Sequence, residues 1–131
     1  MKLNDNCILN DFDISLFLNL EELIIGNNCF ENINQFNIDG LNHLKSLKIG
    51  KNSFTKKKNS RGNDSSRSFS ILNCDKLESI EIGRYSFSDY GGGFELKNLP
   101  KLSTIKIGEI GSDSSNFRCS SFLIEGIIID M

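Results

Sequence analysis

Apolar and polar residues follow one recurring pattern along most of the chain. Each unit begins with Phe, polar, Ile or Leu, and continues eight residues after the Phe with L-x-x-[LI]-x-I-G. The units start at Phe12, Phe36, Phe69, Phe94 and Phe122, and the first four contain the glycines Gly26, Gly50, Gly83 and Gly108. Recurrence at about 24 residues predicts four to five copies of one structural unit.

Alternation of apolar and polar positions within each unit predicts β-strands. The L-x-x-L-x-I-G register predicts parallel strands in one sheet at residues 22–25, 46–49, 79–82 and 104–107. The F-x-I stretches predict a second set of shorter strands. One unit cannot bury its apolar side chains alone, so the units must stack to form a continuous core. The predicted fold is mostly β, a solenoid of about four to five coils with short strands on the face opposite the parallel strands.

Two stretches resemble a known repeat family. Residues 44–54 read L-x-x-L-x-I-x-x-N-x-F, and residues 20–30 read the same. Both are similar to the leucine-rich repeat consensus. The run I-G-x-x-S-F at residues 82–87 also resembles the BspA-type variety of this family, known from bacterial and protist interaction proteins. The resemblance covers roughly residues 12–126.

The resemblance implies a protein-binding scaffold without intrinsic catalysis. In this family the consensus Asn hydrogen-bonds the turn backbone, which would be the role of Asn28 and Asn52 here. Tyr85 and Ile110 replace it in the later units, so those turns must close by other means. Residues 1–131 are expected to form a single leucine-rich repeat domain, complete or a fragment of a longer array.

The outward positions of the parallel strands form the candidate partner-binding face. In family terms these strands line the concave, ligand-binding side. The candidate residues are Glu22, Ile24, Ser46, Lys48, Ser79, Glu81, Thr104 and Lys106. Because Lys48, Glu81 and Lys106 alternate in sign, a ladder of ion pairs that satisfies itself is an equally good interpretation.

A basic insertion at residues 55–68 lengthens the second unit, which begins at Phe36, by about nine residues. Its candidate binding residues are Lys56, Lys57, Lys58, Arg61 and Arg67. A solvated, flexible loop that the fold does not need is one interpretation, and contact with an acidic partner or a phosphate backbone is the other. No aromatic residue interleaves the basic ones, which argues against base stacking.

No pattern in the chain predicts an enzyme, a metal site or a cofactor. His43 is the only histidine, and no partner residue is fixed near it in sequence. Gly91–Gly93 lack the G-x-G-x-x-G spacing of a dinucleotide loop, because Leu96 stands where the last Gly belongs. None of the four cysteines forms a C-x-x-C pair, and Cys74 takes the apolar slot of its unit, so structural thiols are expected.

Charge and hydropathy narrow the class of partner. The net charge is −2, which does not favour specific nucleic-acid binding. No segment has the pattern of a signal peptide or a membrane span, so a cytoplasmic location is the default expectation. The expected function is a protein–protein interaction scaffold with a protein partner. The alternative is a structural spacer, or a repeat fragment of a larger receptor or adaptor, with no ligand of its own.

The chain ends carry a further expectation. Neither end has a polar capping unit, and Ile127–Ile129 is apolar and β-branched. An uncovered terminal strand offers unpaired backbone groups to a neighbour. We expect these ends to be covered by further sequence, by another subunit through self-association, or by the tail folding back.

Overall fold

The computed structural model describes residues 1–7, 12–109 and 113–127. These residues form nine strands and no helix. The strands are β1 (Lys2–Leu3), β2 (Glu22–Ile25), β3 (Gln35–Asp39), β4 (Ser46–Ile49), β5 (Ser68–Leu72), β6 (Ser79–Ile82), β7 (Gly93–Lys97), β8 (Thr104–Ile107) and β9 (Ser121–Glu125). The prediction of a mostly β fold is confirmed.

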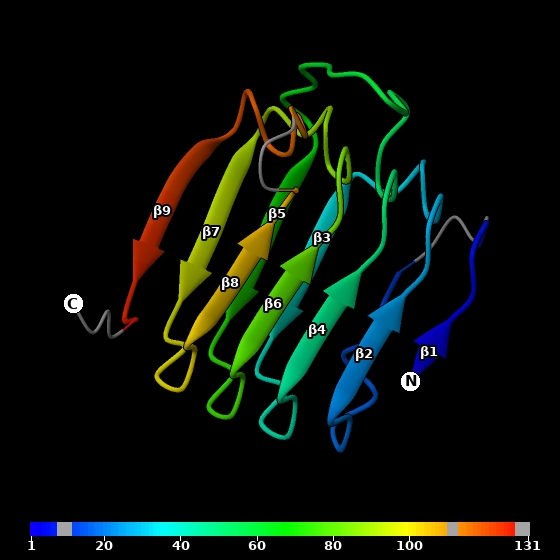
Figure 1. Cartoon of the computed structure of the whole chain (residues 1–131). Helices are drawn as coiled ribbons and strands as arrows, with labels where there is room; N and C mark the ends of the chain where they lie inside the picture. The colour runs from blue at the N-terminus through cyan, green and yellow to red at the C-terminus, as the bar shows by residue number, and fades with distance from the viewer. Residues whose placement is uncertain (8–11, 110–112, 128–131) are drawn as a thin grey trace.

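Two parallel sheets face each other across one core. Sheet A has the order β1-β2-β4-β6-β8, and sheet B has the order β3-β5-β7-β9. From β2 onward the chain alternates between the sheets, and the strands of sheet B run opposite to those of sheet A (Figure 1). The four strands predicted at residues 22–25, 46–49, 79–82 and 104–107 pair in parallel at the expected register.

Inward side chains of both sheets form the core. In sheet A, Leu23, Leu47 and Ile80 occupy paired register positions and are almost fully buried. In sheet B, Phe36 and Phe69 stack with ring centroids 4.8 Å apart and an interplanar angle of 5°. Like residues therefore lie against like residues across neighbouring strands, which is the packing that the sequence pattern requires.

A second row of phenylalanines corrects the sequence register in the fourth unit. Phe30, Phe54, Phe87 and Phe117 all have positive φ, and Phe117 stacks on Phe87 with centroids 4.8 Å apart. In the first three units a Phe follows the glycine by four residues, as Phe87 follows Gly83, and this spacing predicts Ser112 as the equivalent residue of the fourth unit. Ser112 lies outside the described residues, and Phe117 does not fit the spacing. The stretch from Gly108 to Phe117 is longer than in the other units, so counting residues from the glycine missed the match.

Small polar side chains, rather than the consensus asparagines, satisfy the turn backbone. Ser53 Oγ accepts the Cys29 N–H and donates to the Gly26 carbonyl at 2.8 Å. Ser86 Oγ does the same for the Ser53 N–H and the Gly50 carbonyl. Asn52 instead exchanges two hydrogen bonds with Asn59. The role expected for Asn52 from the family resemblance therefore belongs to the residue that follows it.

Glycines at the strand ends permit close backbone approach. A Cβ atom at Gly50 would lie 2.8 Å from the Gly26 carbonyl carbon, and one at Gly83 would lie 2.6 Å from the Gly50 carbonyl oxygen. Neither distance is sterically acceptable for a carbon atom. The glycine row thus lets neighbouring turns of sheet A come together.

The edge formed by β8 and β9 is open in the described part of the chain. Ile105 and Ile107 point to the core side of β8 yet are 44% and 37% exposed, whereas Ile80 and Ile82 in β6 are 1% exposed. Phe122 and Ile124 in β9 are about half exposed. Ile128 and Ile129 lie outside the described residues, and self-association at this edge stays a prediction.

Candidate partner-binding face

The outward rows of sheet A bring the predicted face residues together. One row pairs Glu22, Ser46, Ser79 and Thr104 in order, and the next pairs Ile24, Lys48, Glu81 and Lys106. All eight are exposed or half-buried. The face is therefore continuous across four neighbouring strands, and each residue has its predicted neighbour.

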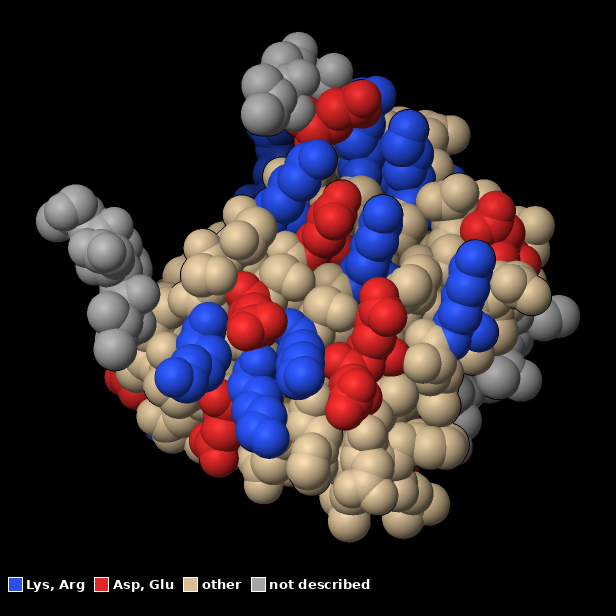
Figure 2. All heavy atoms as spheres, turned by 60° about the horizontal axis from the view of Figure 1, so that its bottom comes forward, with Lys and Arg blue, Asp and Glu red and all other residues tan. Residues whose placement is uncertain are grey.

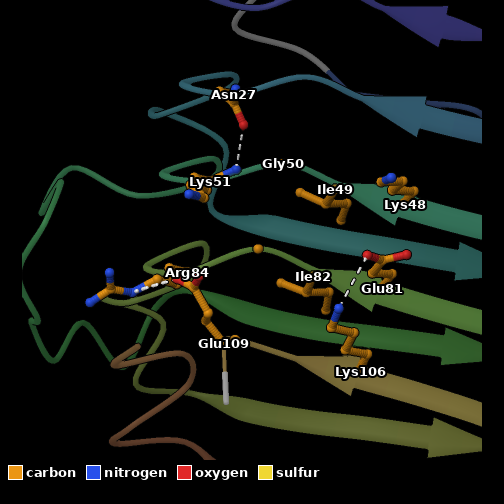
Figure 3. A pocket seen from close by; sticks show the side chains of 12 residues that line it. Asn27, Lys48, Ile49, Gly50, Lys51, Glu81, Ile82, Arg84, Lys106 and Glu109 are labelled. Atoms are coloured by element: carbon orange, nitrogen blue, oxygen red, sulfur yellow. Dashed lines mark hydrogen bonds and ion pairs between the residues drawn. The ribbon is translucent and has the colours of Figure 1, made fainter. Parts of the chain in front are cut away.

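A groove runs along one border of this face, above the glycine row. It encloses about 450 Å³, with Gly50, Gly83 and Gly108 in its lining. One wall is the row Lys48, Glu81 and Lys106, and the opposite wall is Asn27, Lys51, Arg84 and Glu109 (Figure 3). Because glycine has no side chain, the space between the two walls stays empty.

The second wall was missed from the sequence. Its residues directly follow Gly26, Gly50, Gly83 and Gly108. All four residues that follow these glycines have a charged or amide side chain, and this regularity could have identified them. The alternation of strand residues did not, since they lie beyond the strand ends. The structure shows that they line the same groove as the outward residues two positions before the glycine.

Ion pairs neutralise only part of the groove. Glu81 pairs with Lys106 at 3.9 Å, and Arg84 pairs with Glu109 at 3.6 Å. Within the described residues, neither Lys48 nor Lys51 has an ion-pair partner. Lys48 lies in β4 and Lys51 lies two residues beyond its end, on the opposite wall, so two lysines without an ion pair line the same part of the groove. The predicted salt ladder thus includes Glu81 and Lys106 and leaves Lys48 out.

A row of backbone amides also lies on this groove, and one of them lacks an acceptor. Asp5 Oδ1 accepts the Asn27 N–H at 2.8 Å, and Asn27 Oδ1 accepts the Lys51 N–H at 2.7 Å. Ser114 Oγ accepts the Glu109 N–H at 3.0 Å. The acceptor for the Arg84 N–H should come from position 51, but a lysine cannot accept a hydrogen bond. No described residue accepts that N–H.

Charges elsewhere on the neighbouring surface are mixed. Figure 2 shows basic and acidic side chains interspersed over the face it presents, with no broad area of one sign. A surface with mixed charges does not favour the binding of extended polyanions such as nucleic acid. The lysine pair of the groove is therefore a local feature.

The basic insertion divides into exposed residues and one buried residue. Lys56, Lys57, Lys58 and Arg61 are exposed, as predicted. Lys58 Nζ lies 2.9 Å from Glu31 Oε2, and this hydrogen bond lowers the pKa of the Glu31 carboxyl. Both partners are substantially solvated, so the pair contributes little to stability.

Arg67 was wrongly assigned to the exposed basic loop, because its side chain is fully buried. Its Nη2 donates to the carbonyls of Glu31 and Ile33 at 2.7 and 3.1 Å. Its Nε lies 3.5 Å from Asp89 Oδ1, and its guanidinium sits 5.0 Å from the centroid of the Tyr90 ring. A buried arginine needs such partners, and here they come from segments far away in sequence.

The hydroxyl of Tyr90 donates to the same Ile33 carbonyl that Arg67 contacts. Burial raises the pKa of this phenol far above its usual range. Arg67, Asp89 and Tyr90 therefore form one buried polar cluster that ties the start of β5 to the segment before β3.

The insertion is also held along its length, which corrects the expectation of a flexible loop. Thr55 Oγ1 and Ser88 Oγ share a hydrogen bond of 2.7 Å. Gly62 donates its N–H to the Ser88 carbonyl at 3.0 Å, and Asp64 forms a parallel bridge with Tyr90. Deleting residues 56–65 would remove the contacts of Gly62 and Asp64 with the segment before β7.

Other candidate chemical groups have structural surroundings. His43 is exposed, as predicted. All four cysteines are free thiols, and burial raises the pKa of Cys29 and Cys74. Cys74 is fully buried, in agreement with its predicted apolar slot. Among residues 1–7, 12–109 and 113–127, no group of three His, Cys, Asp or Glu side chains is arranged to hold a metal ion.

Comparison with known proteins identifies no relative. No protein-family model matches the chain, and no curated protein or solved structure matches it. The described residues include no helix with the length and apolarity needed to cross a lipid bilayer.

Proposed function

We propose that this chain is a protein-binding scaffold of the leucine-rich repeat type, a solenoid whose binding surface is the outward face of β2, β4, β6 and β8. The observation that carries the proposal is the groove along the glycine row, where Lys48 and Lys51 have no ion-pair partner among the described residues.

Three further features support this proposal. The motifs at residues 20–30 and 44–54 resemble the leucine-rich repeat consensus. The strands they contain lie side by side in one parallel sheet, so their outward residues form a surface broad enough for a partner. β4 and β6 pair with each other along their whole length, and the rings of Phe54 and Phe87 stack beyond the ends of these strands. These contacts give the outward surface a fixed shape.

The opposite sheet provides a matched control for the test. Ser79 lies outward at the start of β6 on sheet A, and Ser70 lies outward in the middle of β5 on sheet B. Both serines are half-buried, and both strands have a neighbour on each side. Arginine at either position adds the same bulk and charge.

The experiment is affinity capture from the native source with wild type, Ser79→Arg and Ser70→Arg, followed by identification of the bound proteins. We expect a protein that wild type and Ser70→Arg retain and Ser79→Arg loses. A partner lost only with Ser70→Arg would move the binding surface to sheet B. Equal retention by all three proteins would contradict the proposed face.

A structural spacer without a ligand is the second candidate function. The open edge at β8 and β9 favours it, because apolar residues such as Ile105 and Phe122 are there exposed on their core side. A spacer would show no partner on either sheet face in the same experiment.

A further inference from the structure

The groove of sheet A contains an incomplete row of hydrogen bonds. Asp5 accepts from the Asn27 N–H, Asn27 accepts from the Lys51 N–H, and Ser114 accepts from the Glu109 N–H. Only the N–H of Arg84 lacks an acceptor in this row among the described residues. The chain thus presents a donor at the place where its other turns have an oxygen atom.

The two lysines without an ion pair among the described residues line the same groove. Lys51 stands at the position from which the acceptor should come, and Lys48 faces it across Gly50 (Figure 3). Arg84 itself contributes little free charge, because its guanidinium pairs with Glu109 and donates to the Asp113 carbonyl at 2.8 Å. Two lysines and one backbone donor therefore belong to residues that line the same groove.

From this arrangement we propose that the groove binds a carboxylate of an acidic protein segment, held by Lys48, Lys51 and the backbone N–H of Arg84. The carboxylate oxygen takes the place that Asp5 and Asn27 oxygens take in the preceding turns. Hydrogen bonds from charged or backbone donors to a carboxylate are short and strong. This inference rests on the proposed function and names the chemistry of the partner.

A polyanion such as nucleic acid fits the site less well. The chain has a net charge of −2, and acidic side chains are interspersed over the surface that Figure 2 shows. Binding along a phosphate backbone needs many basic contacts in a row. Two lysines in one groove of about 450 Å³ suit one or two carboxylates instead.

The test uses the whole chain and a fluorescein-labelled hexaglutamate peptide as the probe. Binding is measured by fluorescence anisotropy for wild type, for Lys48→Glu/Lys51→Glu and for the control Lys76→Glu/Lys101→Glu. The control changes net charge equally, and its lysines are exposed outside the groove. We expect the groove variant to bind about fivefold more weakly than the control. Equal affinities for the two variants would overturn the proposal.

A second pair of variants tests the backbone donor. Lys51→Asn supplies an acceptor like that of Asn27, whereas Lys51→Ala removes the charge and supplies none. If the Arg84 N–H binds the probe, Lys51→Asn binds more weakly than Lys51→Ala. In NMR spectra of wild type, the Arg84 amide proton should move downfield as the peptide is added. Equal affinities for the two variants, with an unmoved Arg84 signal, would overturn the amide contact.

The outcomes separate this inference from the scaffold proposal. A protein partner that Ser79→Arg loses but Lys48→Glu/Lys51→Glu retains would overturn the carboxylate site and leave the scaffold proposal intact. Binding of a labelled hexanucleotide of DNA in preference to hexaglutamate would assign the site to phosphate and overturn the inference. Hexaglutamate binding without any protein partner on sheet A would contradict the scaffold proposal alone.

Discussion

Strands β6 and β8 have nearly the same sequence pattern and very different surroundings. β6 reads SIEI and β8 reads TIKI, and both point their isoleucines to the core side of sheet A. Ile80 and Ile82 are 1% exposed, whereas Ile105 and Ile107 are 44% and 37% exposed. β6 lies between two strands, whereas β8 has a strand on one side only among the residues that the structure describes. The burial of core-facing side chains, here called enclosure, therefore depends on the neighbouring strands as much as on the strand's own pattern of apolar and polar residues.

The same contrast separates chemically identical side chains elsewhere in the chain. Arg67 is enclosed and Arg61 is exposed, although both belong to one insertion. Cys74 is enclosed and Cys119 is exposed. Each pair allows the effect of enclosure to be measured with one substitution or one reaction.

The largest effect is expected for the arginine pair. Arg67→Ala leaves Asp89 buried without its ion-pair partner and removes two donors to backbone carbonyls. We expect a loss of about 3–5 kcal/mol in the free energy of unfolding, as for other broken buried pairs. Arg61→Ala should cost less than about 0.5 kcal/mol. Urea unfolding of both variants measures this, and similar losses would show that Arg67 is not enclosed in solution.

The isoleucine pair tests the two strands directly. Ile82→Ala truncates a fully buried side chain and should destabilise by about 2–5 kcal/mol, as should Leu47→Ala. Ile107→Ala should cost less than about half of that, since much of its side chain is already in water. Equal losses at Ile82 and Ile107 in thermal unfolding would mean that β8 is covered in solution.

The cysteine pair gives a kinetic test. Burial raises the pKa of the Cys74 thiol, so this residue loses its proton at a higher pH than a free thiol does. We expect Cys119 to react quickly with a thiol-specific disulfide reagent at pH 8, and Cys74 to react only when the chain unfolds. Comparable rates for the two thiols in the native protein would contradict the enclosed position of Cys74.

The raised pKa also has a consequence for stability. The unfolded chain loses the Cys74 proton at a lower pH than the folded chain does. Stability from this group is therefore complete below the usual thiol range of about pH 8–9 and falls as pH rises through it. A Cys74→Ala variant, which has no thiol, should lose less stability between pH 7 and pH 10 than wild type.

The smallest effect is expected at the surface. Lys58 pairs with Glu31, but the two side chains are 34% and 51% exposed. Lys58→Ala should change the free energy of unfolding by less than about 0.5 kcal/mol. A cost as large as that of Leu47→Ala would mean that the pattern of enclosed and exposed positions is wrong.

The sequence predicted what depends on regular spacing. Because strand side chains alternate with a period of two and neighbouring units share one register, the four strands of sheet A and their outward rows could be located before the structure. The row that contains Lys48 and Glu81 was expected as part of a binding face. Its geometry is as predicted, and its role in binding stays a proposal.

Features outside the regular spacing could not be located in this way. The insertion breaks the count, so nothing in the sequence linked Arg67 to the carbonyls of Glu31 and Ile33, which are more than thirty residues away. The longer stretch before Phe117 hid its place in the second phenylalanine row. Lys51 and Arg84 lie beyond the strand ends, where periodicity carries no information about which side chains share a groove.

Native-state hydrogen exchange tests the central claim that neighbours on both sides determine enclosure. The account predicts that the backbone amides of β4 and β6 exchange last and that those of β8 and β9 exchange much earlier. Because the pattern of apolar residues is nearly the same in β6 and β8, their difference in exchange isolates the effect of the missing neighbour. Equal protection of β6 and β8 at low protein concentration would contradict the account.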